Sequence, residues 1–202
     1  DLENLEKLVS EQMEREYAQV SRLKLKRQLL DKLNEAHDFE LPPSLVDAEF
    51  DGIWAQVTQQ MEQAGRTFED EGKSEEEMRQ EYRDVAERRV RLGLIIGDIG
   101  ENNSVEVTQD ELRGALLEEA RRYPGQEKFV YEYYEKTPGA IAQLRAPIFE
   151  DKVVDLIVEK VAVTDKKVSV EELAKPLPGD DAEANAAAEG GEEAAAGTKD
   201  QA

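Results

Sequence analysis

Carboxylates are the only side chains abundant enough in this sequence to suggest chemistry at a site. The chain of 202 residues contains 47 Asp and Glu residues, three of which stand together at Glu75–Glu77. Clustered carboxylates can act as a general acid and base or hold Ca²⁺. These three directly follow Ser74, however, and so occupy the first turn of a predicted helix, where the helix dipole favours negative charge. We therefore interpret them as structural.

Other side chains that carry chemistry are scarce. His37 is the only histidine, and the chain has no cysteine. Paired-histidine metal sites, thiolate nucleophiles and disulfides are thereby excluded. The spacing of Gly93, Gly97 and Gly100 is GxxxGxxG, which is not a dinucleotide fingerprint, and there is neither a P-loop nor a nucleophile elbow. We expect no cofactor, no metal and no catalytic residue.

Charge narrows the choice of partners. The formal net charge is -21 at pH 7, and such a surface repels phosphate backbones, so direct binding of nucleic acid is not expected. No run is apolar enough for a bilayer span, and no signal peptide is recognisable, so no membrane partner is expected either. Because Asp1 is not a methionine, we expect the chain to be a processed product or an excised piece.

The spacing of apolar residues predicts an all-α fold. Leu and other apolar residues recur every three or four positions in stretches separated by Pro, Gly and polar residues, at about 1–35, 43–65, 74–100, 108–122, 128–136 and 140–161. Ser74 with Glu77 and Thr108 with Glu111 have the spacing of capping boxes. Residues Val161–Val170 are rich in β-branched side chains but have no partner strand, which favours an extended connection. A further cap, Ser169 with Glu172, precedes a short helical turn.

We divide the chain into two regions. Residues 1–175 are predicted to form an elongated multi-helix domain with a long first helix and protruding helical arms. Residues 176–202 are rich in Ala, Glu, Asp and Gly and show no apolar periodicity. Such a segment cannot bury enough surface to offset its ordering entropy, so we predict a disordered acidic tail.

The run Arg88–Ile99 is the most apolar part of the predicted third helix. Its apolar residues cover several sides of the helix, so it forms either the centre of a core or a surface for a partner. Gly93 and Gly97 lie four apart, and we expect a neighbouring helix to approach closely there. The basic residues of the run, Arg88, Arg89 and Arg91, are expected to pair with acidic neighbours.

Several motifs occur together in a recognisable order. They are LPPSLVDAEF at 41–50, AERRVRLGLIIGDIGENN at 86–103, VTQDEL at 107–112, and the segment from Tyr123 to Leu173. In this order they resemble the C-terminal domain of the trigger factor family of ribosome-associated bacterial chaperones. The resemblance covers residues 1 to about 173, and it places Arg88–Ile99 where an arm joins the body, which favours core packing.

The resemblance implies a helical body with two arms that form a cradle for unfolded or nascent polypeptides. It implies a cytoplasmic protein with roles in protein folding and cell division. The family binds the ribosome through an N-terminal domain and carries a β-rich prolyl isomerase domain, and this sequence contains the motifs of neither. We therefore expect this chain to be no enzyme and to lack its own contact with the ribosome.

Large apolar side chains in the expected arms are the candidates for contact with a client, meaning the unfolded polypeptide that a chaperone binds. Each fits a place in the core equally well, so both interpretations stay open, as does self-association. A helical adaptor for one folded partner is the alternative function. The candidates are Met61, Phe68, Met78, Tyr82, Phe129, Tyr133, Ile141 and Phe149.

Overall fold

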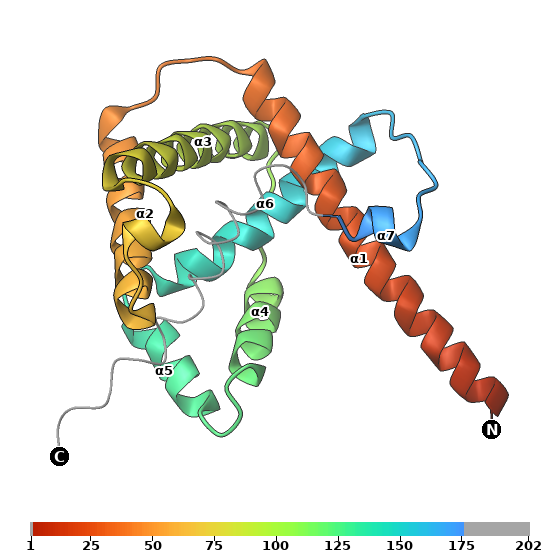
Figure 1. Ribbon diagram of the computed structural model, residues 1–202. Coiled ribbons are helices and arrows are strands. Elements are labelled where there is room, and N and C mark those ends of the chain that lie inside the picture. Colours follow the sequence, from red (N-terminus) through yellow and green to blue (C-terminus); the bar gives the residue numbers. More distant parts are fainter. Residues whose placement is uncertain (1, 176–202) are drawn as a thin grey trace.

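The computed structural model describes residues 2–175, which form α-helices, one 3₁₀ turn and no β-strand. The all-α prediction is confirmed, whereas the predicted disordered tail, 176–202, lies outside the described residues. The elements, shown in Figure 1, are α1 (Leu2–Ala36), α2 (Pro43–Ala64), the 3₁₀ turn Phe68–Glu71, α3 (Glu75–Asn102), α4 (Gln109–Arg121), α5 (Glu127–Lys136), α6 (Ala140–Lys160) and α7 (Val170–Leu173).

The helix ends follow the predicted local signals. Helix α2 begins at Pro43, whose missing N–H costs nothing in the first turn, and ends at Gly65, which adopts the left-handed conformation with φ 64°. In the capping box that begins α3, Glu77 N donates to Ser74 Oγ (3.2 Å) and Ser74 N donates to Glu77 Oε2 (2.8 Å). Thr108 and Glu111 form the same reciprocal pair at the start of α4. Both predicted capping boxes are therefore confirmed.

Helices α2 and α3 pack against each other and form the first arm. Figure 1 shows them meeting at the left of the molecule, with α3 running from there towards α1 and α6. Within the run Arg88–Ile99, the apolar side chains of Leu92, Ile95 and Ile96 are buried. The run therefore belongs to the core, as the resemblance favoured.

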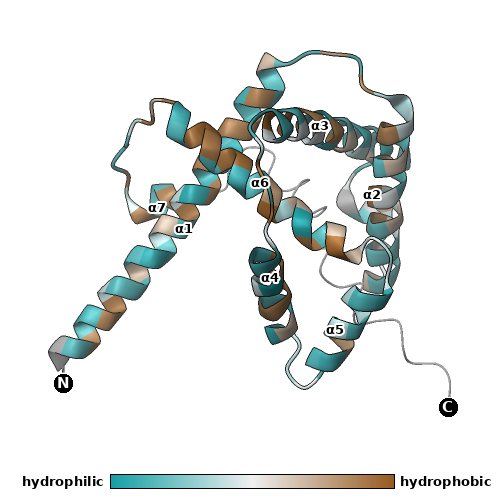
Figure 2. Ribbon diagram, turned by 180° about the vertical axis from the view of Figure 1, so that it is seen from behind, coloured by the Kyte–Doolittle hydropathy of each residue, from teal (hydrophilic) through white to brown (hydrophobic). Residues whose placement is uncertain are grey.

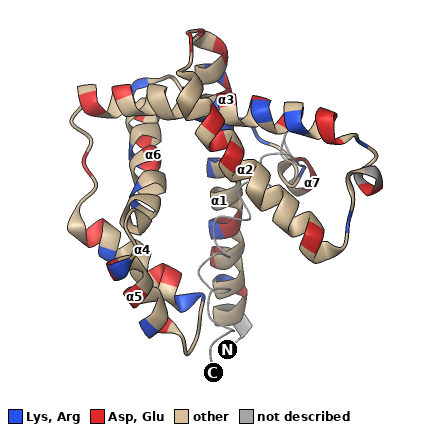
Figure 3. Ribbon diagram, turned by 90° about the vertical axis from the view of Figure 1, so that its left-hand side faces the viewer, with Lys and Arg blue, Asp and Glu red and all other residues tan. Residues whose placement is uncertain are grey.

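The second arm consists of the short helices α4 and α5, which pack on each other and on α6. In the view of Figure 3, α4 and α5 lie on one side of α1 and α2 lies on the other. The two arms therefore leave the body in different directions.

Helix α1 has 35 residues and is about 52 Å long at 1.5 Å per residue. Its C-terminal half lies against α3 and α7, while its N-terminal half projects away from the other helices (Figure 1). Ion pairs attach the C-terminal half: Arg22 to Asp155 at 2.7 Å and Lys26 to Glu150 and Asp151 at 2.7 Å each. Burial lowers the pKa of Lys26, but the bonds to Asp151 and Glu150 outweigh it and leave that pKa above its ordinary value.

The glycines of α3 behave differently from the prediction. A Cβ placed on Gly93 or Gly97 would meet nothing within 4 Å, so the expected close approach of a helix at these residues is wrong. The close approach occurs at Gly100, where a Cβ would overlap the ring of Phe149 from α6. Buried Leu92 and Ile96 turn Gly93 outward, because adjacent helical positions point 100° apart.

All three arginines of the same run bond to neighbouring helices. The predicted pairing with an acidic residue is confirmed for two of them. Arg88 pairs with Asp31 of α1 at 2.7 Å, and Arg89 pairs with Glu49 of α2 at 3.1 Å. Arg91 donates instead to the neutral amide oxygen of Asn34, at 3.3 Å. No helix among the described residues is long and apolar enough to cross a membrane.

Candidate functional site

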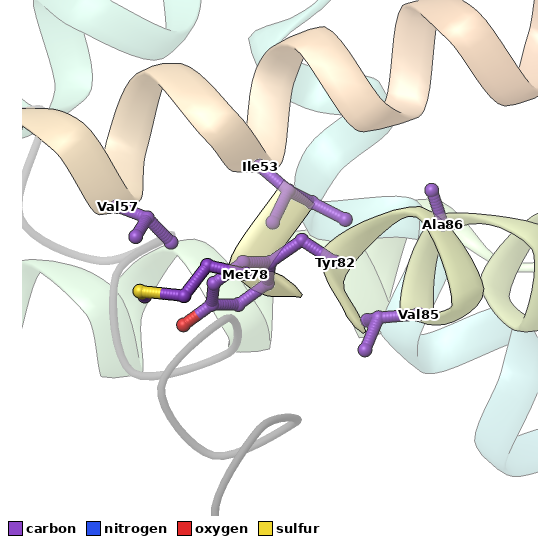
Figure 4. Packing of buried hydrophobic residues seen from close by; sticks show 6 residues of the cluster. All are labelled: Ile53, Val57, Met78, Tyr82, Val85 and Ala86. Carbon is purple, nitrogen blue, oxygen red and sulfur yellow. The ribbon is translucent and has the colours of Figure 1, made fainter. Parts of the chain in front are cut away.

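Two of the candidate contact residues lie inside the first arm. Met78 and Tyr82 are each only 6% exposed and belong to a buried cluster shown in Figure 4. Met61 and Phe68 are partly buried and pack against the same cluster. This arm therefore uses those four side chains for its own stability. The buried members of the cluster are Ile53, Val57, Met78, Tyr82, Val85 and Ala86.

Trp54 closes the tip of the first arm, although sequence reasoning did not select it. Its ring stacks on Phe68 at 5.6 Å and on Phe50 at 6.0 Å, and it meets Tyr82 edge-on. The guanidinium of Arg79 lies 4.4 Å from the Trp54 ring centroid, a distance at which cation–π attraction operates. The sequence spacing could have predicted the stack of these two rings, because Phe50 and Trp54 are four residues apart and share a helix face.

The second arm presents its aromatic residues to solvent. Phe129 is 70% exposed, while its neighbour Val130 is buried against the arm. Tyr133 is half-buried and meets Tyr134 edge-on at 5.2 Å. Burial raises the pKa of Tyr134 above its ordinary value. Among the candidates, Phe129 and Tyr133 therefore have surface that an external chain can reach.

The remaining two candidates lie on α6. Ile141, in its first turn, is 40% exposed, beside the second arm. Phe149 is half-buried further along the helix, and its ring occupies the space left by the missing side chain of Gly100. The contacts of Phe149 thus assign it a packing role between α6 and α3, whereas Ile141 stays accessible.

The free half of α1 carries an apolar stripe that the candidate set missed. Leu5, Leu8, Val9 and Met13 are between 43% and 63% exposed. Their spacing of three and four residues places them on one side of the helix, and Figure 2 shows the hydrophobic residues there alternating with hydrophilic ones. The periodicity was visible in the sequence. Periodicity alone does not reveal that no other helix covers this stretch.

Glu111 joins the second arm to α6. Besides its capping bonds to Thr108, it accepts a hydrogen bond from Lys152 of α6 at 2.7 Å. The bond from Lys152, followed by the bonds from Thr108, lowers the pKa of Glu111 to about 2. Glu111 therefore stays ionised far into the acid range and anchors the start of α4.

The side chains that suggested chemistry have structural partners. Glu75 pairs with Arg79 at 2.8 Å, Glu77 closes the capping box, and His37 Nδ1 lies 2.8 Å from the carbonyl oxygen of Leu33. In the described part of the chain, no group of three or more His, Cys, Asp or Glu residues is placed to hold a metal ion. These side chains therefore serve helix ends and ion pairs in the described part of the chain.

A sequence model of the bacterial trigger factor C-terminus matches residues 1–159 of the chain. The chain belongs to the trigger factor family. The trigger factor of Brucella abortus (strain S19) is 56% identical over 172 residues, which cover 85% of this chain and 36% of that protein. The trigger factor of Rhizobium etli (strain CIAT 652) is 52% identical over 184 residues, or 91% of this chain and 37% of that protein.

A third trigger factor, from Afipia carboxidovorans, is 53% identical over 174 residues, or 86% of this chain and 38% of that protein. The chain thus spans little more than a third of the length of these trigger factors. The family predicted from the ordered motifs is confirmed, and the part of the family that matches is the C-terminal one.

Proposed function

We propose that this chain is a polypeptide-holding chaperone domain that binds unfolded or nascent segments and so limits their aggregation. The observation that carries the proposal is the placement of large exposed apolar side chains on several separate elements. They occur on the free half of α1, on the second arm and at the start of α6. A helical domain that needed only to be stable would cover such residues, because exposed apolar patches otherwise promote aggregation.

The mode of binding follows from the size and surroundings of these patches. Each patch contains only a few side chains, and charged residues surround them, so one patch gives a weak contact. An unfolded segment also loses conformational freedom when it is held, which lowers its affinity further. Several weak patches on different elements suit clients of unrelated sequence and allow them to leave and fold.

Of the candidates, we retain Phe129, Tyr133 and Ile141 as client contacts and add Leu5, Leu8, Val9 and Met13. We leave out Met78 and Tyr82, whose burial leaves little surface for a client, and assign packing roles to Met61, Phe68 and Phe149.

The proposal includes no catalysis. We propose that the chain lacks prolyl isomerase activity and that ribosome binding belongs to a part of longer family members that is not in this sequence. We also propose that the protein is cytoplasmic and that residues 1–175 form the holding domain, with residues 176–202 as a separate acidic segment.

Aggregation assays with the full 202-residue chain test the proposal. Light scattering should show slower aggregation of several unrelated proteins diluted from denaturant. The double variant Leu8→Ser with Phe129→Ser should protect less at the same concentration. The matched control is Arg15→Ser with Arg121→Ser, which changes exposed residues of α1 and of α4, the helix that packs on α5 in the second arm.

Protection of a single folded partner would instead support the adaptor function, and failure to slow any aggregation would reject the holding role. Turnover of a prolyl peptide above background would contradict the absence of isomerase activity. Residue-level NMR of the labelled chain, titrated with an unfolded client, would identify the contacting residues.

A further inference from the structure

The sulfur of this chain is confined to three methionines, and the fold places them in three different surroundings. The sequence has three Met residues and no cysteine. Met78 is 6% exposed within the buried cluster of the first arm, and Met61 is partly buried against that cluster. Met13 is 43% exposed on the free half of α1. A dissolved reagent that attacks sulfur therefore reaches Met13 more readily than the other two.

The surroundings of Met13 leave its side chain open to solvent. The half of α1 that carries it projects away from the other described helices (Figure 1). The polar side chains beside it bond to one another along the helix: Gln12 donates to Glu16 at 2.9 Å, and Arg15 pairs with Glu11 at 3.6 Å. Met13 itself continues the apolar stripe of the free half. A change at its sulfur therefore alters the character of the stripe and leaves these bonds in place.

Met78 is shielded by the same packing that stabilises the first arm. It lies with Ile53, Val57 and Tyr82 in the buried cluster (Figure 4). An oxygen atom added to its sulfur would be a polar group in an apolar core, which destabilises the folded state unless the group finds a hydrogen bond. Modification of Met78 would thus lower stability, whereas modification of Met13 changes a surface.

The relevant reaction is a two-electron oxidation by a peroxide. A sulfur lone pair attacks one oxygen of hydrogen peroxide, so that an S–O bond forms as the O–O bond breaks. The proton on the transferred oxygen passes to the departing hydroxide. The thioether is thereby oxidised to a sulfoxide, and the peroxide is reduced to water. The sulfoxide is polar, and methionine sulfoxide reductases convert it back to the thioether.

We propose that Met13 is a reversible oxidation site, and that its sulfoxide weakens the holding of clients by α1 when the chain meets a peroxide. The inference rests on the proposed function, since it names a regulation of one client-contact surface. An apolar client segment gains less from a sulfoxide than from a thioether, because the sulfoxide oxygen loses its water on contact. The first arm keeps its fold meanwhile, since its cluster shields Met78.

Peptide mapping by mass spectrometry tests the selectivity in the full 202-residue chain. Samples taken during treatment with hydrogen peroxide give the rate at which each methionine gains one oxygen. Met13 should react at least about tenfold faster than Met78, with Met61 between them. In concentrated urea the three rates should agree within about twofold, because the fold no longer shields any of them. Equal rates in the folded chain would overturn the inference.

Binding of an unfolded client tests the consequence. The probe is reduced and alkylated lactalbumin, which stays unfolded, and the peroxide is removed before the probe is added. Oxidation limited to Met13 should raise the Kd about two- to fivefold, as expected for one partly exposed apolar side chain among several. The two sulfoxide reductases, one for each epimer, should restore the original Kd. A Kd that does not change on oxidation would overturn the inference.

Two variants at the same residue separate this effect from oxidation elsewhere. Met13→Leu stays apolar but has no sulfur, so peroxide should leave its Kd equal to that of its own untreated form. Met13→Gln carries a polar, uncharged side chain and, without peroxide, should bind about as weakly as the oxidised chain. Met78→Leu is the control, because it retains Met13 and should lose affinity on oxidation. An equal loss in treated Met13→Leu would assign the effect to another residue.

Stability distinguishes a changed surface from a damaged fold. The chain oxidised only at Met13 should keep its helix content by circular dichroism and its urea midpoint, because Met13 lies outside the buried core. A lower urea midpoint together with weaker binding would show that oxidation acts by unfolding the domain, which would contradict the proposed role of Met13.

These measurements separate the inference from the proposed function. If the untreated chain binds lactalbumin and slows aggregation but oxidation of Met13 changes neither, the inference fails and the holding function stands. If the untreated chain neither binds the unfolded probe nor slows aggregation, the proposed function fails and the regulation fails with it. Preferential oxidation of Met13 would in that case still identify the site of modification.

Discussion

The two arms begin with the same device and then differ in what they do with their apolar side chains. Helix α3 in the first arm and α4 in the second each start at a reciprocal capping box. The first arm then buries a continuous cluster around Ile53 and covers its tip with Trp54. The second arm leaves Phe129 in solvent. The way in which a helix begins therefore does not show which arm leaves apolar side chains exposed. The extent to which the helices of an arm bury each other does show it.

Helix length explains the difference. The helices of the first arm have 22 and 28 residues, so their apolar faces cover each other over several turns. Those of the second arm have 13 and 10 residues, and each offers only three or four turns to its neighbours. Short helices cannot cover an aromatic-rich face completely, and the uncovered residues stay exposed to solvent.

The largest effect is expected from a cavity in the first arm. Ile53 is only 2% exposed, and Ile53→Ala should lower the free energy of unfolding by about 2–5 kcal/mol, because the packed helices close such a cavity only in part. Urea unfolding followed by circular dichroism measures the loss. A change below about 0.5 kcal/mol would show that the first arm does not form a cooperative core with the rest of the domain.

A smaller loss is expected where α3 of the first arm packs on α6. Gly100→Ala would force the Phe149 ring aside and should cost about 1–3 kcal/mol, as overpacking of a core does. Gly93→Ala is the control on the same helix. Because nothing lies near its Cβ, it should be neutral or stabilising by up to about 1 kcal/mol through helix propensity.

The double variant Gly100→Ala with Phe149→Leu sharpens this test. A smaller side chain at 149 should recover part of the loss, since residues in contact show non-additive effects. Equal destabilisation by Gly93→Ala and Gly100→Ala would mean that the ring does not occupy that space.

A third, pH-dependent effect concerns the second arm. The pKa of Glu111 lies at about 2, below its ordinary value of 4.5. The stabilisation from its charged form is therefore complete above about pH 4.5 and is lost as the pH falls towards 2. Glu111→Gln should flatten the decline of the urea midpoint between pH 5 and pH 2. Lys152→Met should produce part of the same flattening, because the bond from Lys152 is the largest cause of the low pKa.

Glu77 offers the comparison from the first arm. Its pKa is lowered mainly by the backbone and side-chain bonds from Ser74, and the charge of Lys73 is a smaller cause. Glu77→Gln should flatten the acid limb less than Glu111→Gln. The reverse order would show that the capping bonds, and not Lys152, control the pKa of Glu111.

The smallest effect on stability is expected at Phe129. Phe129→Ala removes a side chain that is 70% exposed and should change the free energy of unfolding by no more than about 0.5 kcal/mol. The neighbouring Val130→Ala, at a buried residue, should cost about 1.5 kcal/mol or more. Client binding should show the opposite order, and a large loss of stability at Phe129 would assign that residue to the core.

Local signals in the sequence predicted most of the fold. The capping boxes at Ser74 and Thr108, Pro43 and the apolar periodicities located six helices, because these signals act within one or two turns. Tertiary placement was harder. Gly93 and Gly97 matched a pattern for close packing, yet the helix turns Gly100 towards α6. A one-dimensional pattern identifies a set of glycines but not which one faces a neighbour.

The candidate site was less predictable for the same reason. Met78 and Phe129 are both large apolar residues in an arm, and nothing in their own sequence context separates the buried one from the exposed one. The difference arises from the length of the partner helix. Likewise, Leu5 and Leu8 continue a periodic pattern that is covered further along α1, so only the three-dimensional arrangement shows where the cover stops.

The way in which α1 is attached has a consequence for the effect of salt. No described side chain of α1 is fully buried. Its attachments to α3 and α6 include the half-exposed pair of Arg22 with Asp155 and the partly buried pairs of Lys26 and Arg88. Mobile ions screen such pairs over a Debye length of about 8 Å at physiological ionic strength. Raising the ionic strength should therefore loosen the attachment of this long helix, most of all at the exposed Arg22 pair. It should affect the buried apolar cluster of the first arm much less, because burial of apolar side chains involves no charge to screen.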